Sequence, residues 1–237
     1  MTSFDAGDNA VSPSPVRILL VDDEALVRSG FRLILEAEAD LVVVAEAADG
    51  ADALVAAANH RPDVVLMDIR MPRLDGVEAT RELTADGFKV LILTTFDLDE
   101  YLFSAVKAGA SGFLLKAVPP DDLVAAIRAV ARGDALVEPR MTRRLLEEFA
   151  RAPGAGATSS GPPVPHGWEH LTDREIEVFH AIARGLNNAE IARDLYISET
   201  TVKSHVAHVL MKLAVRDRIQ AIVLAYESGL ISPGRSS

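Results

Sequence analysis

The stretch D-V-V-L-M-D-I-R-M-P, residues Asp63–Pro72, sets the pattern on which the fold of this chain is built. Its four consecutive apolar residues, 64–67, are typical of a strand covered on both faces of a sheet. The strand ends at the carboxylate of Asp68, and Pro72, which has no backbone N–H, marks the loop that follows. A carboxylate at the C-terminal end of a buried parallel strand lies where open α/β sheets bind ligands.

An earlier stretch, R-I-L-L-V-D-D at Arg17–Asp23, has the same design: an apolar strand that ends in Asp22 and Asp23. Parallel strands end at the same edge of a sheet, so we expect the three carboxylates to lie close together. Such a cluster repels itself unless a cation or a proton joins it. Hard oxygen ligands with water suit Mg²⁺, so the pattern predicts a magnesium site.

Short apolar segments alternate with amphipathic segments between residues 17 and 131. Five β–α units with short loops predict a doubly wound, five-stranded parallel (βα)5 sheet, an α/β fold. The predicted strands are Arg17–Val21, Leu41–Ala45, Asp63–Met67, Lys89–Thr94 and Gly112–Leu115. The predicted helices are Ala25–Glu38, Gly50–Asn59, Gly76–Ala85, Glu100–Ala108 and Pro120–Ala131.

From Trp168 the pattern is purely helical. Thr172 and Glu175 form a capping box that begins one helix, which runs to about Arg184 and ends at Gly185. Further helices are predicted to begin at Asn188, at Ser198 and after Asp217. The sequence therefore predicts a four-helix, all-α second domain whose third helix follows a short turn, the geometry of a helix-turn-helix.

Between these parts lies a segment that cannot pack a core. Pro139–Ala150 is predicted to form a short helix, and the Gly/Pro/Ser/Ala-rich residues 151–167 a linker. The predicted organisation is a disordered leader at 1–15, an α/β domain at 16–135, a helix and flexible linker at 136–167, and the all-α domain at 168–237.

Composition narrows the function classes. The 237 residues include no cysteine, which excludes disulfides and thiolate metal sites. No apolar run approaches the roughly 18 residues of a membrane-spanning helix, so no membrane partner is expected. The N-terminus has neither a basic start nor an apolar core, so it does not resemble a signal peptide. The default expectation is a cytoplasmic protein.

Charge is distributed unevenly along the chain. Residues 1–135 carry a net charge of −11, whereas residues 168–237 carry −1. A nucleic-acid role would therefore need a local basic face in the second domain.

Two further polar groups follow strands of the predicted sheet. Thr94 or Thr95 ends the fourth strand, and Lys116 ends the fifth. A hydroxyl and an ammonium beside three carboxylates would complete a site for a small tetrahedral anion held against Mg²⁺. Attack of one carboxylate on phosphorus would give an aspartyl-phosphate, whose added charge Lys116 would stabilise. The alternative is that the acids only cap the following helices, but five such groups on consecutive strand ends favour a site.

Six motifs together resemble a known family. R-I-L-L-V-D-D, V-V-L-M-D-I-R-M-P-R-L-D-G, V-L-I-L-T-T-F-D and G-F-L-L-K resemble a two-component receiver domain across residues 17–132. L-T-D-R-E-I-E-V and N-N-A-E-I-A-R-D-L-Y-I-S-E-T-T-V-K-S-H-V resemble a LuxR-type helix-turn-helix across residues 168–231. Their order and spacing resemble the NarL/FixJ class of response regulators over nearly the whole chain. The resemblance implies a phosphoprotein that regulates transcription and is no enzyme beyond slow self-dephosphorylation.

The resemblance also assigns roles in the receiver. Asp68 would be the phospho-acceptor, and Thr94 the switch hydroxyl, with Thr95 as the alternative. Lys116 would pair with the phosphate, and Phe113 occupies the position of a switch aromatic without offering a hydroxyl. Asp23 would be a direct Mg²⁺ ligand and Asp22 would act mostly through water, while Asp68 and the backbone carbonyl of Arg70 would complete the metal site. Ala117 follows Lys116 where Pro or Asp is more usual, which disfavours a cis bond there by about 3 kcal/mol.

In the second domain the resemblance places a recognition helix in the major groove. Lys203 and Ser204 would lie near its exposed start, and Ala207 would make an apolar contact such as one with a thymine methyl. His205 and His208 lack a third metal ligand, so a metal pair is disfavoured. The expected DNA contacts are Asn188, Thr200, Thr201, Lys203, Ser204, Ala207 and Lys212.

The implied partners are a sensor histidine kinase, double-stranded promoter DNA with paired half-sites, and a second copy of the chain on activation. Dimerisation would use the first and fifth receiver helices or the segment Asp217–Ser228.

Three alternatives to this function stay open. A hydrolase of the haloacid dehalogenase type normally carries D-x-D on its first strand, unlike the adjacent acids here. A constitutive DNA-binding protein with a degenerate receiver conflicts with the intact acids. A protein–protein regulator with a vestigial helix-turn-helix fits the near-neutral second domain.

Overall fold

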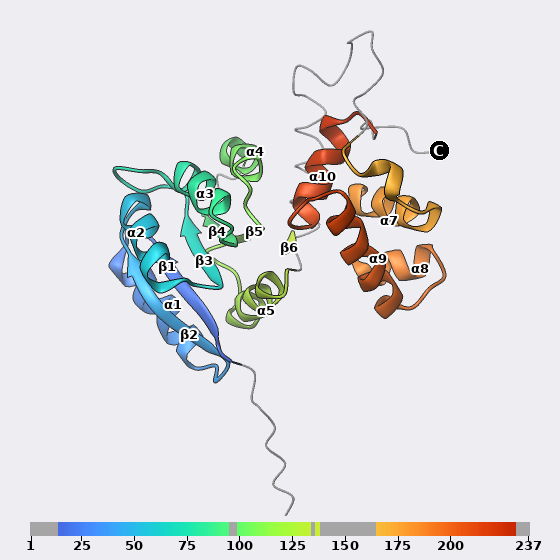
Figure 1. The fold of residues 1–237 in the computed structure, drawn as a ribbon. Helices are drawn as coiled ribbons and strands as arrows, with labels where there is room; N and C mark the ends of the chain where they lie inside the picture. Colours follow the sequence, from blue (N-terminus) through green and yellow to red (C-terminus); the bar gives the residue numbers. More distant parts are fainter. Residues whose placement is uncertain (1–13, 95–98, 134–135, 138–164, 231–237) are drawn as a thin grey trace, which may run out of the picture.

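The computed structural model describes residues 14–94, 99–133, 136–137 and 165–230 (Figure 1). Most of the predicted leader, the predicted helix Pro139–Ala150, nearly all of the linker, and Thr95 lie outside these ranges.

The N-terminal domain is built on a parallel sheet with strand order β2-β1-β3-β4-β5-β6. All five predicted strands are confirmed, with ends that move by at most two residues. A sixth strand was missed: β6 pairs with the outer side of β5, in a segment predicted as helix and linker. A strand of only two residues is too short to show the alternation of apolar and polar residues by which a strand is predicted. The strands are β1 (Val16–Val21), β2 (Leu41–Ala47), β3 (Val64–Asp68), β4 (Val90–Thr94), β5 (Gly112–Leu115) and β6 (Leu136–Val137).

Helices cover both faces of this sheet, which gives three layers (Figure 1). Alternate residues of β1 enter different cores: Ile18 and Leu20 pack with α1 and α5, whereas Leu19 and Val21 pack with α2, α3 and α4. Central strands buried on both sides explain the unbroken apolar run at 64–67. The helices are α1 (Ala25–Glu36), α2 (Gly50–His60), α3 (Gly76–Ala85), α4 (Asp99–Lys107) and α5 (Pro120–Ala131).

The C-terminal domain is all-α, as predicted. A short 3-10 turn, η1 (Trp168–His170), precedes α7 (Asp173–Ala183), α8 (Asn188–Asp194), α9 (Glu199–Lys212) and α10 (Arg218–Glu227). The Thr172–Glu175 capping box forms, and Asn187 and Glu190 form a second one at the start of α8. Ser198 caps α9, and the carboxylate of Asp217 accepts from two backbone N–H groups at the start of α10.

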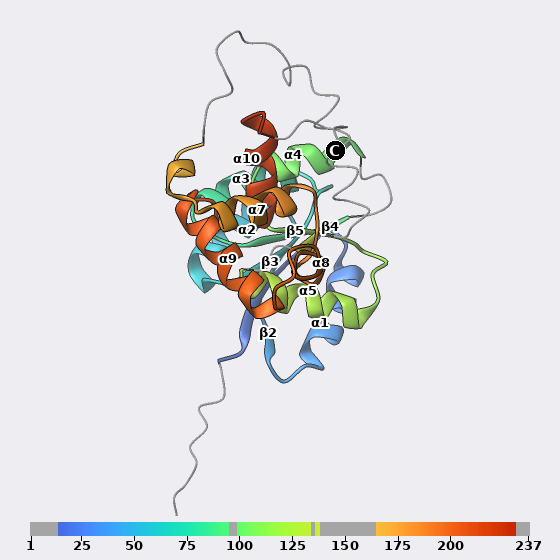
Figure 2. The ribbon, with the colours of Figure 1, turned by 90° about the vertical axis from the view of Figure 1, so that its right-hand side faces the viewer.

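The two domains meet where α10 lies beside α4 (Figures 1 and 2). One continuous cluster of buried apolar residues includes the α2–α4 side of the sheet and the core of the helical domain. In the described part of the chain, no helix is long and apolar enough to cross a membrane.

Candidate functional site

Three carboxylates meet at the C-terminal edge of the sheet, beyond β1 and β3. Oxygen atoms of Asp22, Asp23 and Asp68, here called the acid cluster, lie within 4.8 Å of one another. Asp22 and Asp68 are buried, and Asp23 is exposed. The sequence prediction that these acids converge is confirmed. A set of three hard oxygen donors with one side open to water could bind a divalent metal ion.

Lys116 reaches this cluster from the end of β5. Its Nζ lies 2.7 Å from Asp22 Oδ2 and 2.9 Å from Asp68 Oδ2. Burial opposes the charge of Lys116, but the hydrogen bonds to both carboxylates outweigh it and raise its pKa. Burial also raises the pKa of Asp68, and the negative charge of Asp22 adds to this rise. Lys116 lowers the pKa of Asp68 but does not cancel the two effects. The edge therefore holds more negative charge than one lysine neutralises, which favours a further cation.

The loop after β3 holds the Asp68 backbone in place. Asp68 Oδ1 accepts from the backbone N–H of Ile69 at 2.8 Å, so its two oxygens have different partners. Gly76 packs directly against the Asp68 backbone, where a Cβ would collide with the Asp68 carbonyl. Asp75 then caps α3 by accepting from Val77 and Glu78. The D-G pair of the motif thus folds the loop back onto the strand end.

The other predicted receiver residues lie around this edge. Thr94 is buried at the end of β4, one strand away from Asp68, and Arg70 is exposed in the loop. Phe113 is fully buried in the core that includes α4. There are no cis peptide bonds in the part of the chain that the structure describes, so the bond after Lys116 is trans.

A second group of predicted residues lies on the outer side of α9. Thr200, Thr201, Lys203, Ser204 and Ala207 are all exposed, and we call them the recognition face. Val202 and Val209 point to the opposite side and are buried. The helix thus presents one side to solvent and anchors the other in the domain core.

Two predicted DNA-contact residues are engaged within the protein instead. Lys212 Nζ lies 2.6 Å from Glu175 Oε2, which is itself buried, and Asn188 Oδ1 accepts from Arg218 at 3.2 Å. His208 also points toward Glu175, with Nδ1 at 3.7 Å from Oε1. Sequence spacing does not reveal the pairing of Lys212, because Glu175 lies 37 residues away on another helix.

Glu175 is a stabilising residue of the helical domain. Burial opposes its charge, but hydrogen bonds from Lys212 and Thr172 outweigh burial and lower the pKa of Glu175 to about 2, from 4.5. We expect Glu175→Gln to destabilise this domain by about 1–3 kcal/mol at neutral pH. A group with a depressed folded pKa contributes stability above its unfolded pKa and loses it as the pH falls through the folded value. The difference between wild type and variant should therefore shrink between pH 4.5 and about 2.

The measurement is thermal unfolding of the full chain followed by fluorescence of Trp168. Trp168 is the only tryptophan of the chain, and its ring packs edge-on against that of Phe179, with 5.3 Å between the ring centroids. Its fluorescence therefore reports on this domain. Glu177→Gln is the matched control, because Glu177 is half-exposed and pairs with Arg174 on the same helix. Equal effects of both variants at neutral pH would contradict the assignment.

The sequence pattern did not reveal the contact between the domains. The guanidinium of Arg216 donates to the carbonyls of Thr84 at 2.8 Å and Gly109 at 2.9 Å, in the last turn of α3 and just after α4. Gln220 Nε2 donates to the carbonyl of Val106 at 3.2 Å. A positive group at the C-terminal ends of two helices is electrostatically favourable. A cavity of about 200 Å³ lies beside this contact and is lined in part by Arg216 and Asp217.

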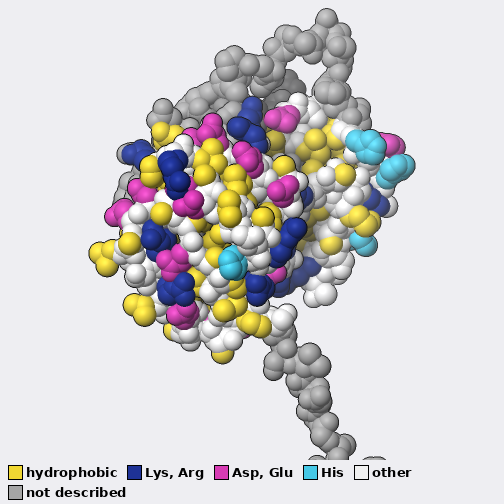
Figure 3. Space-filling view, turned by 60° about the vertical axis from the view of Figure 1, so that its left-hand side comes forward, with side chains coloured by type: hydrophobic (Ala, Val, Ile, Leu, Met, Phe, Trp, Pro, Cys, Tyr) yellow, Lys and Arg dark blue, Asp and Glu magenta, His cyan; other side chains and the backbone are white. Residues whose placement is uncertain are grey.

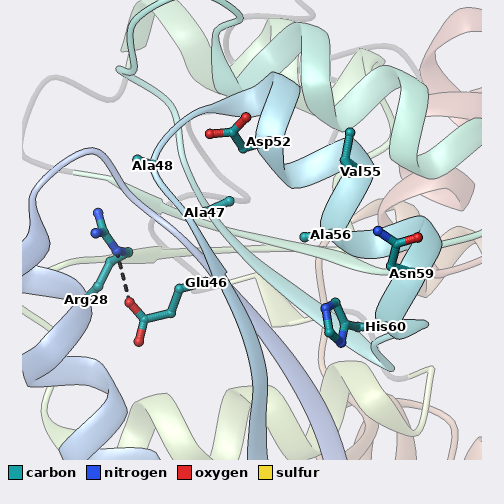
Figure 4. Close-up of a pocket in the computed structure, with 9 residues that line it drawn as sticks. All are labelled: Arg28, Glu46, Ala47, Ala48, Asp52, Val55, Ala56, Asn59 and His60. Atoms are coloured by element: carbon teal, nitrogen blue, oxygen red, sulfur yellow. Dashed lines mark hydrogen bonds and ion pairs between the residues drawn. The ribbon is translucent and has the colours of Figure 1, made fainter.

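A larger, open hollow lies between β2 and α2, and its lining includes Arg28, which donates to the backbone carbonyl of Asp22 at 2.6 Å. Figure 4 shows Arg28 paired with Glu46 on one side, and Asp52, Asn59 and His60 spaced along α2 on the other. These polar groups do not converge on one point. Figure 3 shows charges of both signs interspersed over this receiver face. We assign no binding role to this hollow.

Comparison with known proteins identifies both halves of the chain. The response regulator receiver domain family matches residues 18–128, and the luxR family of bacterial regulatory proteins matches residues 169–225. The transcriptional regulatory protein YxjL of Bacillus subtilis (strain 168) is 41% identical over 218 residues, covering 91% of this chain and 97% of the relative. The chain belongs to the NarL/FixJ class of response regulators.

Other matches agree with this family. The transcriptional regulatory protein DegU of Brevibacillus brevis is 38% identical and covers 93% of this chain and 97% of its own. The crystal structure of the response regulator ChrA, from a heme-sensing two-component system, is 37% identical, covers 92% of this chain and all of its own, and has a TM-score of 0.50. A LuxR-family response regulator from Aurantimonas sp. SI85-9A1 is 38% identical, covers 57% of this chain and 98% of its own, and has a TM-score of 0.52.

This response regulator is thus a transcriptional regulator of the two-component type, with a receiver domain followed by a LuxR-type DNA-binding domain. The two domains imply a kinase and DNA as partners. The family consists of non-enzymatic transcription regulators, which does not support the phosphohydrolase alternative.

Proposed function

We propose that a sensor histidine kinase phosphorylates Asp68 and that the phosphorylated receiver switches dimerisation and DNA binding by the C-terminal domain. The observation that supports this most directly is the position of Asp68: its carboxylate lies at the sheet edge beside Asp22 and Asp23, with Lys116 Nζ at 2.9 Å. This is the arrangement that an aspartyl-phosphate needs.

The acid cluster fits Mg²⁺, since its donors are all carboxylate oxygens and its charge exceeds that of Lys116. Asp22, Asp23, Asp68 and the backbone carbonyl of Arg70 would hold the ion. When bound, Mg²⁺ supplies charge neutralisation for phosphoryl oxygens.

Asp68, Lys116 and Thr94 of the receiver then have separate roles in the phosphoryl transfer. A carboxylate oxygen of Asp68 attacks the phosphorus, and the bond from phosphorus to the imidazole nitrogen of the kinase histidine breaks. Lys116 exchanges its contact with Asp68 for one with a phosphoryl oxygen, and the Thr94 hydroxyl donates to another. The acyl phosphate adds about 1.5–2 negative charges to the edge. Attack of water on phosphorus would return Asp68 slowly to its free form, the only turnover that we propose.

The recognition face supplies the DNA contacts. Thr200, Thr201 and Ser204 carry exposed hydroxyls suited to phosphate, and Lys203 adds a positive charge near the start of α9. Without DNA, Ser204 Oγ donates to the carbonyl of Thr200 at 3.2 Å and Thr201 Oγ1 bonds to Ser198 Oγ at 2.8 Å, so both hydroxyls would exchange a local bond for a phosphate. Ala207 can contact only an apolar group such as a thymine methyl. We leave Lys212 and Asn188 out of this set, because Glu175 holds the ammonium of Lys212 and the Asn188 Oδ1 accepts from Arg218.

The interdomain contact suggests how the receiver controls DNA binding. The receiver touches the start of α10 through Arg216 and Gln220, whereas the recognition face on α9 stays exposed. α4 follows β4, at whose end Thr94 lies, so a phosphate that draws Thr94 inward acts on the same part of the receiver that holds Arg216. Phosphorylation would then bias a two-state contact and free α10.

We further propose that the freed copies dimerise, through α10 or through α1 and α5, and bind paired half-sites. Because both proposed partners, the kinase phosphodonor and promoter DNA, are found in the cytoplasm, we propose that this response regulator acts there. The proposed units are a receiver that begins at residue 16 and includes β6, a connecting segment, and a DNA-binding domain at 168–237.

The test uses the purified full chain with Mg²⁺ and a small acyl- or amidophosphate donor. Intact mass, oligomeric state and affinity for duplex DNA are measured before and after treatment. We expect one phosphoryl group, a change in oligomeric state and tighter DNA binding, all prevented by a chelator. No adduct in the presence of Mg²⁺ would favour a receiver that responds to something other than phosphate.

Weakening the interdomain contact should mimic phosphorylation. Arg216→Ala removes two hydrogen bonds from a charged donor to backbone carbonyls, each worth about 1.5–3 kcal/mol. We expect unphosphorylated Arg216→Ala to bind DNA about tenfold more tightly than unphosphorylated wild type, and to gain little from the phosphodonor. Fluorescence anisotropy with a labelled duplex measures both quantities.

Two controls separate this effect from loss of a DNA contact. Gln220→Ala removes a further interdomain hydrogen bond and should act in the same direction. Arg184→Ala removes an arginine that pairs with Asp194 within the DNA-binding domain, and should leave the response to phosphodonor intact. If neither Arg216→Ala nor Gln220→Ala raises the affinity of the unphosphorylated chain, this contact does not restrain DNA binding.

A further inference from the structure

Tyr196 is the most exposed large apolar side chain in the described part of the chain, at 94%. It stands in the turn between α8 and α9, two residues before Ser198, which caps α9. Within the described ranges its hydroxyl has no hydrogen-bond partner. A single exposed apolar residue is ordinary. The backbone conformation of Tyr196, however, is unusual for a tyrosine.

The backbone of Tyr196 is left-handed, with φ of 55°. The N–H of Ile197 donates to the carbonyl of Ala192 at 3.0 Å, which makes Tyr196 the residue just after the C-cap of α8 in a Schellman motif. Glycine or asparagine usually occupies that position, because other side chains are strained there. Neither the backbone nor the packing of the domain benefits from a tyrosine at this point.

The residues on either side of Tyr196 are anchored. Leu195 and Ile197 pack against the buried core, and the carbonyl of Leu195 accepts from the Arg174 guanidinium on α7. The phenol therefore projects into solvent from a fixed turn rather than from a mobile loop. A donor held in this way loses little conformational freedom on binding.

The position of the turn relative to DNA follows from helix-turn-helix geometry. The first helix of the motif crosses the DNA backbone while the second enters the major groove, so the turn between them lies at the groove edge, where phosphates line the path. Tyrosine hydroxyls are among the side chains that contact phosphate. Tyr196 is also continuous with the recognition face, which begins at Thr200.

The charge of this domain increases the importance of neutral donors. Arg184 pairs with Asp194, Lys212 with Glu175, and Arg174 with Glu177, all within this domain. With a net charge of −1 over residues 168–237, few cations are left for phosphate. Hydroxyl groups must therefore supply a large share of the phosphate contacts.

We infer that the Tyr196 hydroxyl donates a hydrogen bond to a DNA backbone phosphate at the edge of the groove. The inference rests on the proposed DNA-binding function and adds to it a contact outside the recognition helix. It makes Tyr196 a residue that lowers the stability of the domain and raises its affinity for DNA.

The test compares wild type, Tyr196→Gly and Tyr196→Phe as full chains treated with phosphodonor and Mg²⁺. The probe is a fluorescent mixed-sequence duplex at low salt, because phosphate contacts do not depend on base sequence. We expect both variants to bind about threefold to tenfold more weakly. The unfolding temperature of Tyr196→Gly, followed by Trp168 fluorescence, should equal or exceed that of wild type, since glycine relieves the left-handed backbone.

Salt dependence gives an independent readout. A neutral donor displaces no counterion, so the slope of log affinity against log salt should be the same for Tyr196→Phe and wild type. Unchanged affinity of either variant overturns the inference: full binding by Tyr196→Phe alone would mean that the ring, and not the hydroxyl, touches DNA. If wild type does not bind the duplex, the proposed function itself fails and this inference falls with it.

Discussion

Replacing Asp68 by alanine should abolish phosphorylation by a small phosphodonor and every response that depends on it. The carboxylate that Lys116 holds at 2.9 Å would be gone, and neither Asp22 nor Asp23 lies at the end of β3, the position that we propose for the phosphoryl group. Intact mass should show one phosphoryl group on wild type and none on Asp68→Ala. Oligomeric state and DNA affinity of the variant should not change on treatment.

The matched control is Asp86→Asn, which removes an exposed acid at the end of α3, away from the acid cluster. It should accept the phosphoryl group as wild type does. An adduct on Asp68→Ala would move the acceptor to another residue, and peptide mapping would locate it. Since alanine removes a buried charge from a crowded acidic edge, we expect the variant to fold at least as well as wild type, which separates loss of chemistry from loss of structure.

Replacing Lys203 by alanine should weaken DNA binding by at least about tenfold at low salt, because a charge-assisted hydrogen bond to phosphate or to a base edge is worth about 1.5–3 kcal/mol. Lys203 is exposed on α9 beside Thr200, Thr201 and Ser204, and it is the lysine of the recognition face. The slope of log affinity against log salt should become less steep by about one if its partner is a phosphate.

Two comparisons interpret this result. Lys203→Arg keeps the charge and should retain most of the affinity for a mixed-sequence duplex. Arg184→Ala removes a charge that Asp194 already neutralises, so both affinity and slope should stay near those of wild type. Unchanged affinity of Lys203→Ala at physiological salt would remove Lys203 from the DNA interface and favour a protein–protein role for the C-terminal domain.

The elements of this fold and the polar ends of its strands could be predicted because they depend on residues close together in the chain. The apolar run 64–67 signals a strand covered on both faces, and Asp68 marks its end. Thr172 and Glu175 lie three residues apart, so their capping box is visible in the sequence and forms as expected. Convergence of Asp22, Asp23 and Asp68 followed from one further rule, that parallel strands end at a common edge.

Other features could not be predicted, because they join residues far apart through packing. β6 has only two residues and exists because the edge of β5 is free to pair. Lys212 has the charge and the place in the motif that are expected of a phosphate contact. The fold instead brings it to Glu175, which lies 37 residues away in the sequence. Arg216 bonds to carbonyls 107 and 132 residues away, a contact that depends on how two separate domains meet.

The sequence by itself determined the strand and helix order, the acids at the sheet edge and the caps of the helices, since hydrophobic period and local hydrogen bonding are properties of a few neighbouring residues. Tertiary structure alone decided which cations stay available for DNA, which helix the receiver touches, and that Tyr196 projects from a turn whose backbone suits glycine. Each of these depends on distances between elements, and such distances are set by the packing of whole layers.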